Sequence, residues 1–137
     1  MLVTIELPSF PPKQRPKFKR EGSSVMAYYD QDYEPLRQSI IDQWKGAPLT
    51  GRVALEMDFR VPMPKRTSKA TRARMLAGEI RPSDKHVDSL LRALMDAMVG
   101  VVVHDDRQVV FLSGRLSYGE APGATVRVGE AVFLAAA

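Results

Sequence analysis

The sequence predicts a small α+β fold, in which a mixed β-sheet packs against two amphipathic helices. Three observations lead to this prediction. The 137 residues are enough for one domain with a single core, and 45% of them are hydrophobic. Strand-like and helix-like stretches follow one another in the order β-α-β-α-β-β, with a basic segment before the second helix. No internal repeat divides the chain, so we expect a single domain over residues 1–137.

The beginning of the chain combines a strand with a proline-rich segment. Residues 2–7 alternate between apolar and polar side chains, which predicts a strand. The prolines that follow disfavour regular structure and predict a stiff loop: Pro8, Pro11, Pro12 and Pro16. Phe18, Tyr28 and Tyr29 come next. Packing in the protein or stacking against a nucleic-acid base would each account for these aromatic residues.

A helix and a second strand are expected next. Residues 33–45 predict a helix that begins after Asp30 or Asp32. We expect its inner side to carry Leu36, Ile40, Ile41 and Trp44. Residues 51–61 have a period of two, which predicts a strand with one wet face.

The second half of the chain begins with an irregular excursion. Residues 62–83 contain three prolines, few large apolar residues and a cluster of basic side chains that could bind phosphates, so we expect a mobile, DNA-facing segment with a helical turn over 71–77. Further strands are expected at 109–112 and 125–134. The turns between them are predicted at Gly114, Gly119, Pro122 and Gly123.

Residues 85–106 carry the most informative pattern. From Asp88 onward, apolar residues fall on one arc of a helix: Leu90, Leu91, Leu94, Met95, Ala97 and Met98. Asp88, Arg92 and Asp96 form a polar row at spacings of i, i+4 and i+8. Gly100 is expected to end this helix, and residues 101–103 predict a short buried extended run before Asp105 and Asp106.

Two interpretations of these carboxylates are open. The polar row would suit a solvated helix face with ion pairs that contribute about 0.2–0.5 kcal/mol each, and the adjacent aspartates would suit a solvated turn. An aspartate at a helix start together with an aspartate pair after a buried segment would also hold a hard divalent ion. Magnesium takes oxygen ligands and one or two carboxylates, and water and phosphate oxygens fill its remaining positions.

These residues resemble the RusA-type endodeoxyribonucleases, which resolve Holliday junctions. That family has Asp-x-Asp-Asn-Leu-x-Lys, then Asp-Ala-Leu, a short turn and Asp-Asp-x-Gln. This chain has the matching segments His86-Val87-Asp88-Ser89-Leu90-Leu91-Arg92, Asp96-Ala97-Met98, Gly100 and Asp105-Asp106-Arg107-Gln108. Leu7-Pro8 and the stretch from Pro11 to Phe18 resemble the basic, proline-rich opening of the family. The resemblance covers most of the chain and implies a RusA-like fold.

The resemblance implies metal-assisted hydrolysis of a DNA phosphodiester. Mg²⁺ is the expected cofactor, with Mn²⁺ as an alternative, and the candidate ligands are Asp88, Asp106, Asp105 and His86. Arg92 would contact the phosphate oxygens as charge develops. Two residues depart from the family, which has Asp in place of His86 and Lys in place of Arg92. A histidine nitrogen suits manganese, zinc or iron better than magnesium, and arginine cannot donate a proton near neutral pH. Three roles remain open for His86: metal ligand, general base or structural residue.

The basic residues are concentrated in two segments. The net charge is +4 and the sequence pI is about 9.6. The first cluster comprises Lys13, Arg15, Lys17, Lys19 and Arg20. The second comprises Lys65, Arg66, Lys69, Arg72, Arg74 and Arg81, and Lys85 follows it. Such clusters are candidates for binding the DNA backbone, although solubilising surface would explain any single lysine.

The expected function is an endodeoxyribonuclease that cleaves Holliday junctions and other branched DNA in recombination or repair. One alternative is a junction-binding module that cuts weakly or not at all because of His86 and Arg92. Others are a broader nuclease that also cuts flaps and forks, and a purely structural protein. The resemblance implies a homodimer, and the twofold symmetry of a four-way junction favours the same state. The absence of cysteine excludes disulfides and thiolate metal sites. We expect no membrane partner and a cytoplasmic location in a bacterial or phage-infected cell.

Overall fold

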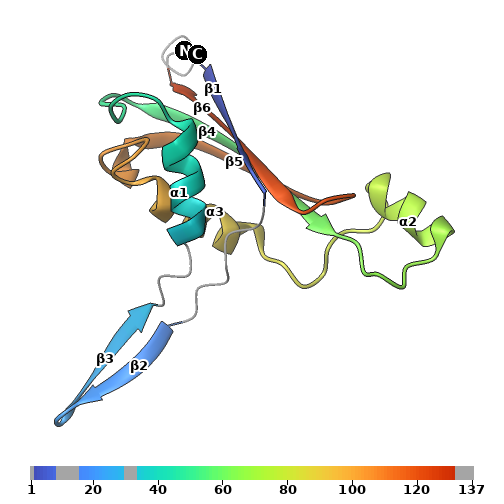
Figure 1. Ribbon diagram of the computed structural model, residues 1–137, viewed down its shortest axis with the longest axis horizontal. Coiled ribbons are helices and arrows are strands. Elements are labelled where there is room, and N and C mark those ends of the chain that lie inside the picture. Colours follow the sequence, from blue (N-terminus) through green and yellow to red (C-terminus); the bar gives the residue numbers. More distant parts are fainter. Residues whose placement is uncertain (1, 9–15, 30–33, 132–137) are drawn as a thin grey trace.

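A four-stranded mixed sheet forms the centre of the molecule. The computed structural model describes residues 2–8, 16–29 and 34–131. The sheet has the spatial order β1 (Leu2–Leu7), β6 (Gly123–Glu130), β4 (Val53–Pro62) and β5 (Val109–Gly119). Strands β4 and β5 are parallel, whereas β1–β6 and β4–β6 are antiparallel. The predicted α+β class with a mixed sheet is confirmed (Figure 1).

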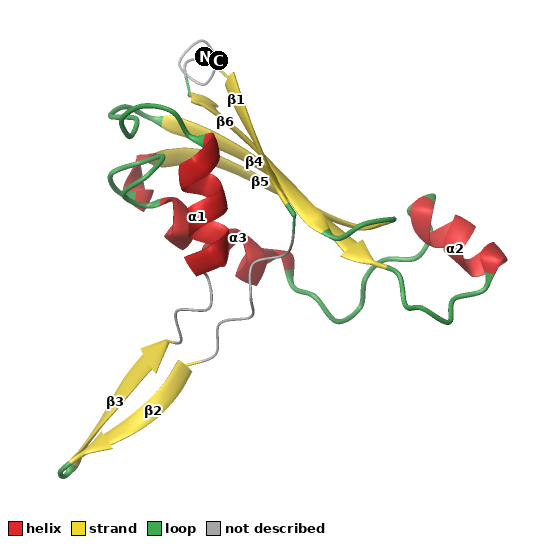
Figure 2. Ribbon diagram, viewed as in Figure 1, coloured by secondary structure: helices red, strands yellow, loops and turns green. Residues whose placement is uncertain are grey.

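Two helices cover one face of this sheet, α1 (Glu34–Gln43) and α3 (Val87–Met98) (Figure 2). Helix α1 buries Leu36 and Ile40, and Trp44 packs just beyond its end. The prediction for Ile41 was wrong, because its side chain is 41% exposed. Ile41 lies about 100° around the helix from Ile40, which turns it away from the sheet. The candidate caps Asp30 and Asp32 lie outside the described residues.

The strand periodicity separates a dry face from a wet one. Strand β4 buries alternate residues against the helices, as predicted: Val53, Leu55, Met57, Phe59 and Val61. Its opposite face carries charged side chains that pair across strands. Arg127 lies 3.1 Å from Asp58, and Arg60 lies 3.5 Å from Glu6. A pocket on this face is lined mainly by such paired groups, so its charges largely neutralise one another.

Gly114 lies within β5, although the sequence predicted a turn there. A Cβ at this position would lie 2.9 Å from both δ carbons of Leu91 and 3.0 Å from Cγ2 of Val87. The absence of a side chain at Gly114 therefore allows α3 to pack closely against β5, and the strand continues to Gly119. The turn between β5 and β6 is confirmed, and it lies between Gly119 and Gly123.

Val101 and Val102 form a turn after α3, so the extended conformation predicted for residues 101–103 was wrong for these two, whereas Val103 forms β-bridges with Leu49 and Val99. The backbone N–H groups of Val101, Val102 and Val103 all donate to the carbonyl of Met98. Val102 and Val103 are buried, as the apolar pattern indicated. Gly100 has a φ of 87°, a conformation that a glycine adopts readily, and α3 ends at Met98.

Two further elements project from the body in Figure 1. The hairpin of β2 (Pro16–Glu21) and β3 (Ser24–Tyr29) was missed, because the prolines before it suggested a loop throughout. Helix α2 (Lys69–Leu76) extends the predicted helical turn, and the Ser68 side chain caps it by accepting from the Thr71 N–H. Helix α2 buries no residue. No helix in the described part of the chain is long and apolar enough to cross a membrane.

Candidate active site and nucleic-acid interface

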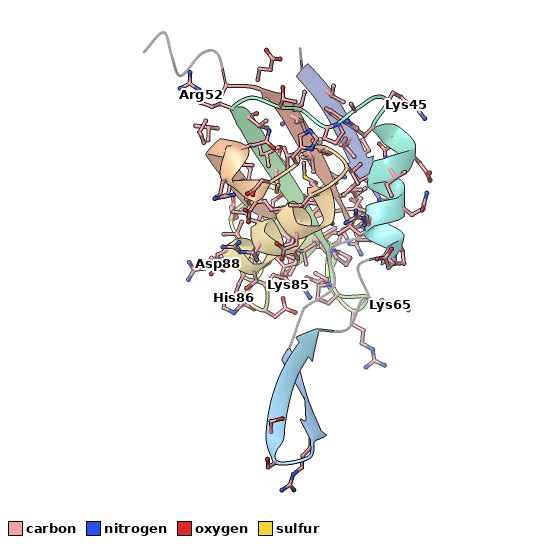
Figure 3. All side chains as sticks on the ribbon, turned by 90° about the vertical axis from the view of Figure 1, so that its left-hand side faces the viewer. Lys45, Arg52, Lys65, Lys85, His86 and Asp88 are labelled. Carbon is pink, nitrogen blue, oxygen red and sulfur yellow. The ribbon has the colours of Figure 1, made fainter. Side chains whose placement is uncertain are left out.

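Helix α3 carries the first candidate site residues at its amino-terminal end. Its apolar stripe buries Leu90, Ala93, Leu94, Ala97 and Met98, which fixes the outward direction of the polar side. Asp88 lies exposed in the first turn, where the partial positive charge of a helix start favours a carboxylate. His86 occupies the N-cap position, and its side chain makes no capping hydrogen bond. Figure 3 shows Lys85, His86 and Asp88 near one another at the lower edge of the body, above the projecting hairpin.

Arg92 connects α3 to the turn that contains the aspartate pair. Its Nη1 atom lies 3.6 Å from Oδ2 of Asp106, the first residue of the short 3₁₀ helix η1 (Asp106–Gln108). The Arg92 side chain is 70% exposed and that of Asp106 is 38% exposed, so solvent screens this pair. Asp96 is also exposed. Within the described residues Arg92 therefore pairs across the tertiary structure, not along its own helix.

Asp105 has a different environment from its neighbour. Its carboxylate caps η1 by accepting from the Arg107 N–H at 2.8 Å, and it also accepts from Nε and Nη2 of the Arg107 side chain. These hydrogen bonds to Arg107, side chain first and backbone second, hold the pKa of Asp105 well below its usual range. The same interaction raises the pKa of Arg107. Both carboxylate oxygens of Asp105 thus accept hydrogen bonds from Arg107, within the same turn.

The arrangement leaves a small set of donors for a metal ion. Over residues 2–8, 16–29 and 34–131, no group of three or more His, Asp or Glu side chains is placed to hold one. Asp105 faces Arg107, which leaves two candidate carboxylates, Asp88 in the first turn of α3 and Asp106 beside Arg92, with His86 beside Asp88 in sequence. Two carboxylates match what magnesium commonly takes from a protein. The donor chemistry therefore suits a hard divalent ion, with water and a phosphate completing its coordination.

The second basic cluster divides into paired and exposed residues. Arg72 lies 3.2 Å from Glu120, and Arg74 lies 3.1 Å from Glu79. The first of these pairs ties α2 to the turn after β5. By contrast, the segment leading into α2 and its first residue present exposed cations: Lys65, Arg66 and Lys69. In the view of Figure 3, Lys65 lies at about the same height as Lys85, His86 and Asp88.

The first basic cluster lies partly on the hairpin. Lys17, Lys19 and Arg20 belong to β2, and Arg20 is exposed. Lys13 and Arg15 lie outside the described residues. The backbone pairing also places Phe18, Tyr28 and Tyr29 on the two hairpin strands. The sequence signal for this hairpin was Gly22-Ser23 between two short strand-like runs, a spacing that favours a tight turn.

A mixed sheet covered on one face by two helices, one of which pairs with the aspartate turn through Arg92 and Asp106, defines a small α+β domain. The family model described as Endodeoxyribonuclease RusA matches residues 8–129, which is most of the chain, and the protein therefore belongs to the RusA endodeoxyribonuclease family.

A curated relative, the uncharacterized protein YqaN of Bacillus subtilis (strain 168), is 33% identical over 85 residues. This match covers 60% of the present chain and 60% of the relative. The aligned part is therefore less than two thirds of either protein.

Proposed function

We propose that the protein is a divalent-metal-dependent endodeoxyribonuclease that cleaves Holliday junctions and related branched DNA. The observation that carries this proposal is the approach of Arg92 to Asp106, which brings the middle of α3 and the aspartate turn of a RusA-family chain together. Its setting would be recombination or repair of DNA in the cytoplasm of a bacterial or phage-infected cell.

In this proposal Asp88 and Asp106 hold the metal ion. Both are carboxylates, and among the described residues the Asp88 side chain makes no hydrogen bond or ion pair. When bound, Mg²⁺ or Mn²⁺ would lower the pKa of the attacking water and neutralise charge on the leaving oxygen. His86 is a further donor, and its nitrogen would move the preference toward Mn²⁺.

Arg92 would bind the phosphate. It is mostly exposed and held near Asp106 by a screened ion pair of the kind that contributes about 0–1 kcal/mol. A phosphate could displace such a contact at little cost. The planar guanidinium would then donate to the non-bridging oxygens and stabilise the charge that develops on them. Because arginine stays protonated, this role involves charge and orientation, not proton transfer.

The basic elements would hold the DNA backbone. Lys65, Arg66 and Lys69 are exposed near α2, and the first cluster includes exposed Arg20 on the hairpin. Lys85 adjoins His86 at the start of α3. Backbone contacts of this kind bind DNA irrespective of its sequence, and the branched shape of the substrate would supply selectivity.

We also propose a homodimer in which the edge strand β5 pairs with its copy. Strand β5 ends the sheet, and it exposes Val110 by 48% and Leu112 by 40%. Such an edge invites pairing with another strand. A dyad would also match the symmetry of a four-way junction. The double variant Val110→Lys/Leu112→Lys should sediment as a monomer. In junction cleavage it should produce single nicks instead of the paired incisions expected of a dimer. A double variant that remains dimeric would exclude this interface.

The decisive experiment compares substrates under defined metal and salt conditions. Labelled four-way junctions, flaps, forks and linear duplexes are incubated with Mg²⁺, Mn²⁺ or a chelator. We expect metal-dependent cleavage of the junction, which Asp88→Asn and Asp106→Asn abolish while binding persists, because losing negative charge lowers repulsion of the phosphate. Binding without cleavage in either metal would indicate a junction-binding module. Equal cleavage of all branched substrates would indicate a broader nuclease.

The role of His86 has its own test. If it binds the metal, His86→Asp should shift the preference from Mn²⁺ toward Mg²⁺ and flatten the loss of activity on acidification, since a carboxylate needs no deprotonation near neutral pH. The same metal preference and pH profile in the wild type, His86→Ala and His86→Asp would assign His86 a structural role.

A further inference from the structure

We infer that Gln108 is a positioning residue that fixes the aspartate turn relative to α3, and that, of the two adjacent aspartates, Asp105 closes this turn while Asp106 is directed at Arg92. The inference deepens the proposed function, because it concerns how Asp106 is oriented. It rests on the hydrogen bonds of Gln108 and on the different partners of the two adjacent aspartates.

The Gln108 side chain makes four hydrogen bonds. Its Oε1 accepts from the backbone N–H of His104 at 2.8 Å and from that of Asp105 at 3.0 Å. Its Nε2 donates to the carbonyls of Leu49 at 2.7 Å and Gly51 at 3.0 Å. Both lone pairs and both N–H groups of the amide are therefore used. One side chain thus ties the aspartate turn to the loop that leads into β4.

The same loop is tied to the turn after α3. The N–H of Leu49 donates to the carbonyl of Val102 at 2.8 Å, and Gly100 donates to Val103 at 2.7 Å. The buried Val102 and Val103 anchor that turn in the core. Gln108 consequently connects the aspartate turn, through the loop at Leu49, to the segment on which α3 ends. The position of the turn relative to Arg92 depends on this connection.

The two aspartates divide their roles. The Asp105 carboxylate is directed at Arg107 by a backbone bond and side-chain bonds of 2.9–3.2 Å. The Asp106 carboxylate instead faces Arg92 on α3. Asp106 also contributes to the charge environment of Arg107, but of the two aspartates it is the one paired with Arg92. A metal that used Asp105 would have to break its capping arrangement, whereas Asp106 is held by a screened ion pair with Arg92 and a charge interaction with Arg107.

An amide is the side chain that suits the position of Gln108. Glutamate in its place would set a second oxygen against the carbonyls of Leu49 and Gly51, and leucine would leave two carbonyls and two N–H groups without partners. Gln108→Glu and Gln108→Leu therefore loosen the turn in different ways. Gln38→Glu on α1 is the matched control, because the exposed amide of Gln38 bonds only to Asp42 among the described residues.

The test measures amide hydrogen exchange residue by residue and Mn²⁺ binding by paramagnetic resonance, both on the full chain without DNA. In Gln108→Glu and Gln108→Leu we expect at least tenfold faster exchange at His104 and Asp105, with the β4 amides unchanged, and at least tenfold weaker Mn²⁺ binding. Gln38→Glu should match the wild type in both measurements. Unchanged exchange at His104 and Asp105 would overturn the inference, and so would a uniform increase that includes β4.

The aspartates provide the second arm of the experiment. Asp105→Asn keeps a capping oxygen, so we expect Mn²⁺ affinity within threefold of wild type, whereas Asp106→Asn should lose at least tenfold. Equal losses in both variants would make Asp105 a ligand and overturn the division of roles. If the wild type binds no Mn²⁺, the proposed metal site fails, and the exchange measurement alone still decides the role of Gln108.

Discussion

Replacing Gly114 by alanine tests whether the close approach of α3 to β5 limits this position. The added Cβ would lie 2.9–3.0 Å from side-chain carbons of Leu91 and Val87, whereas ordinary contacts are 3.4–4 Å. Leu91 is only partly buried and can rotate, but the β-branched Val87 is stiff. We therefore expect a packing cost near 2 kcal/mol, within the range of about 1–3 kcal/mol for overpacking.

Part of this cost is offset in the unfolded chain. Alanine has less unfolded-state entropy than glycine, which stabilises the folded protein by about 0.4–1 kcal/mol. The net expectation is a loss of about 1 kcal/mol in the free energy of unfolding, or about 3–5 °C in Tm. Because Val87 adjoins Asp88, any outward shift of α3 should also slow cleavage at temperatures where the variant is fully folded.

The assay is urea unfolding followed by circular dichroism, with calorimetry for Tm. Gly51→Ala is the matched control, since a Cβ at Gly51 would meet nothing within 4 Å and its φ is not positive. We expect this control to equal or slightly exceed the wild type in stability. Gly114→Ala that is as stable as Gly51→Ala would refute the reasoning, because the neighbouring side chains would then yield without cost.

Three further predictions concern the turn, the basic residues and the core. The hydrogen bonds from Arg107 depress the pKa of Asp105, so its contribution to stability is fully present above the unfolded pKa of about 3.9 and is lost as pH falls toward the folded value. The stability difference between wild type and Asp105→Asn in urea unfolding should therefore narrow below about pH 4, and a constant difference would contradict this. Leu94→Ala should cost about 2–5 kcal/mol, because Leu94 is fully buried, and a loss below 1 kcal/mol would count against a tight core. The basic residues to be neutralised one at a time are Lys65, Arg66 and Lys69. Each substitution that removes a phosphate contact should lower the slope of log K against log salt for junction binding by about 0.9. Arg74→Gln should lower this slope less, because Arg74 is already paired with Glu79.

Local patterns in the sequence determined much of the fold and the identity of the candidate residues. The period of two over β4 and the apolar stripe of α3 could be predicted from the sequence, because each burial pattern repeats along the chain itself. The carboxylates near residues 88 and 106 were recognised for the same kind of reason, as residue types at a spacing that resembles a family. The family assignment rests on this linear pattern and is confirmed by the match over residues 8–129.

Other features depended on contacts between distant parts of the chain. Glycine is typical of turns, so the sequence suggested a turn at Gly114. The close packing of Leu91 against this position explains why the strand has a glycine there. Asp105 and Asp106 are equivalent in sequence, yet one bonds to Arg107 and the other faces Arg92 on α3. The exposure of Ile41 depended on how α1 is turned on the sheet. Sequence periodicity indicates which side of an element is apolar, but tertiary packing selects the neighbours, and these neighbours give two adjacent carboxylates different ion-pair partners.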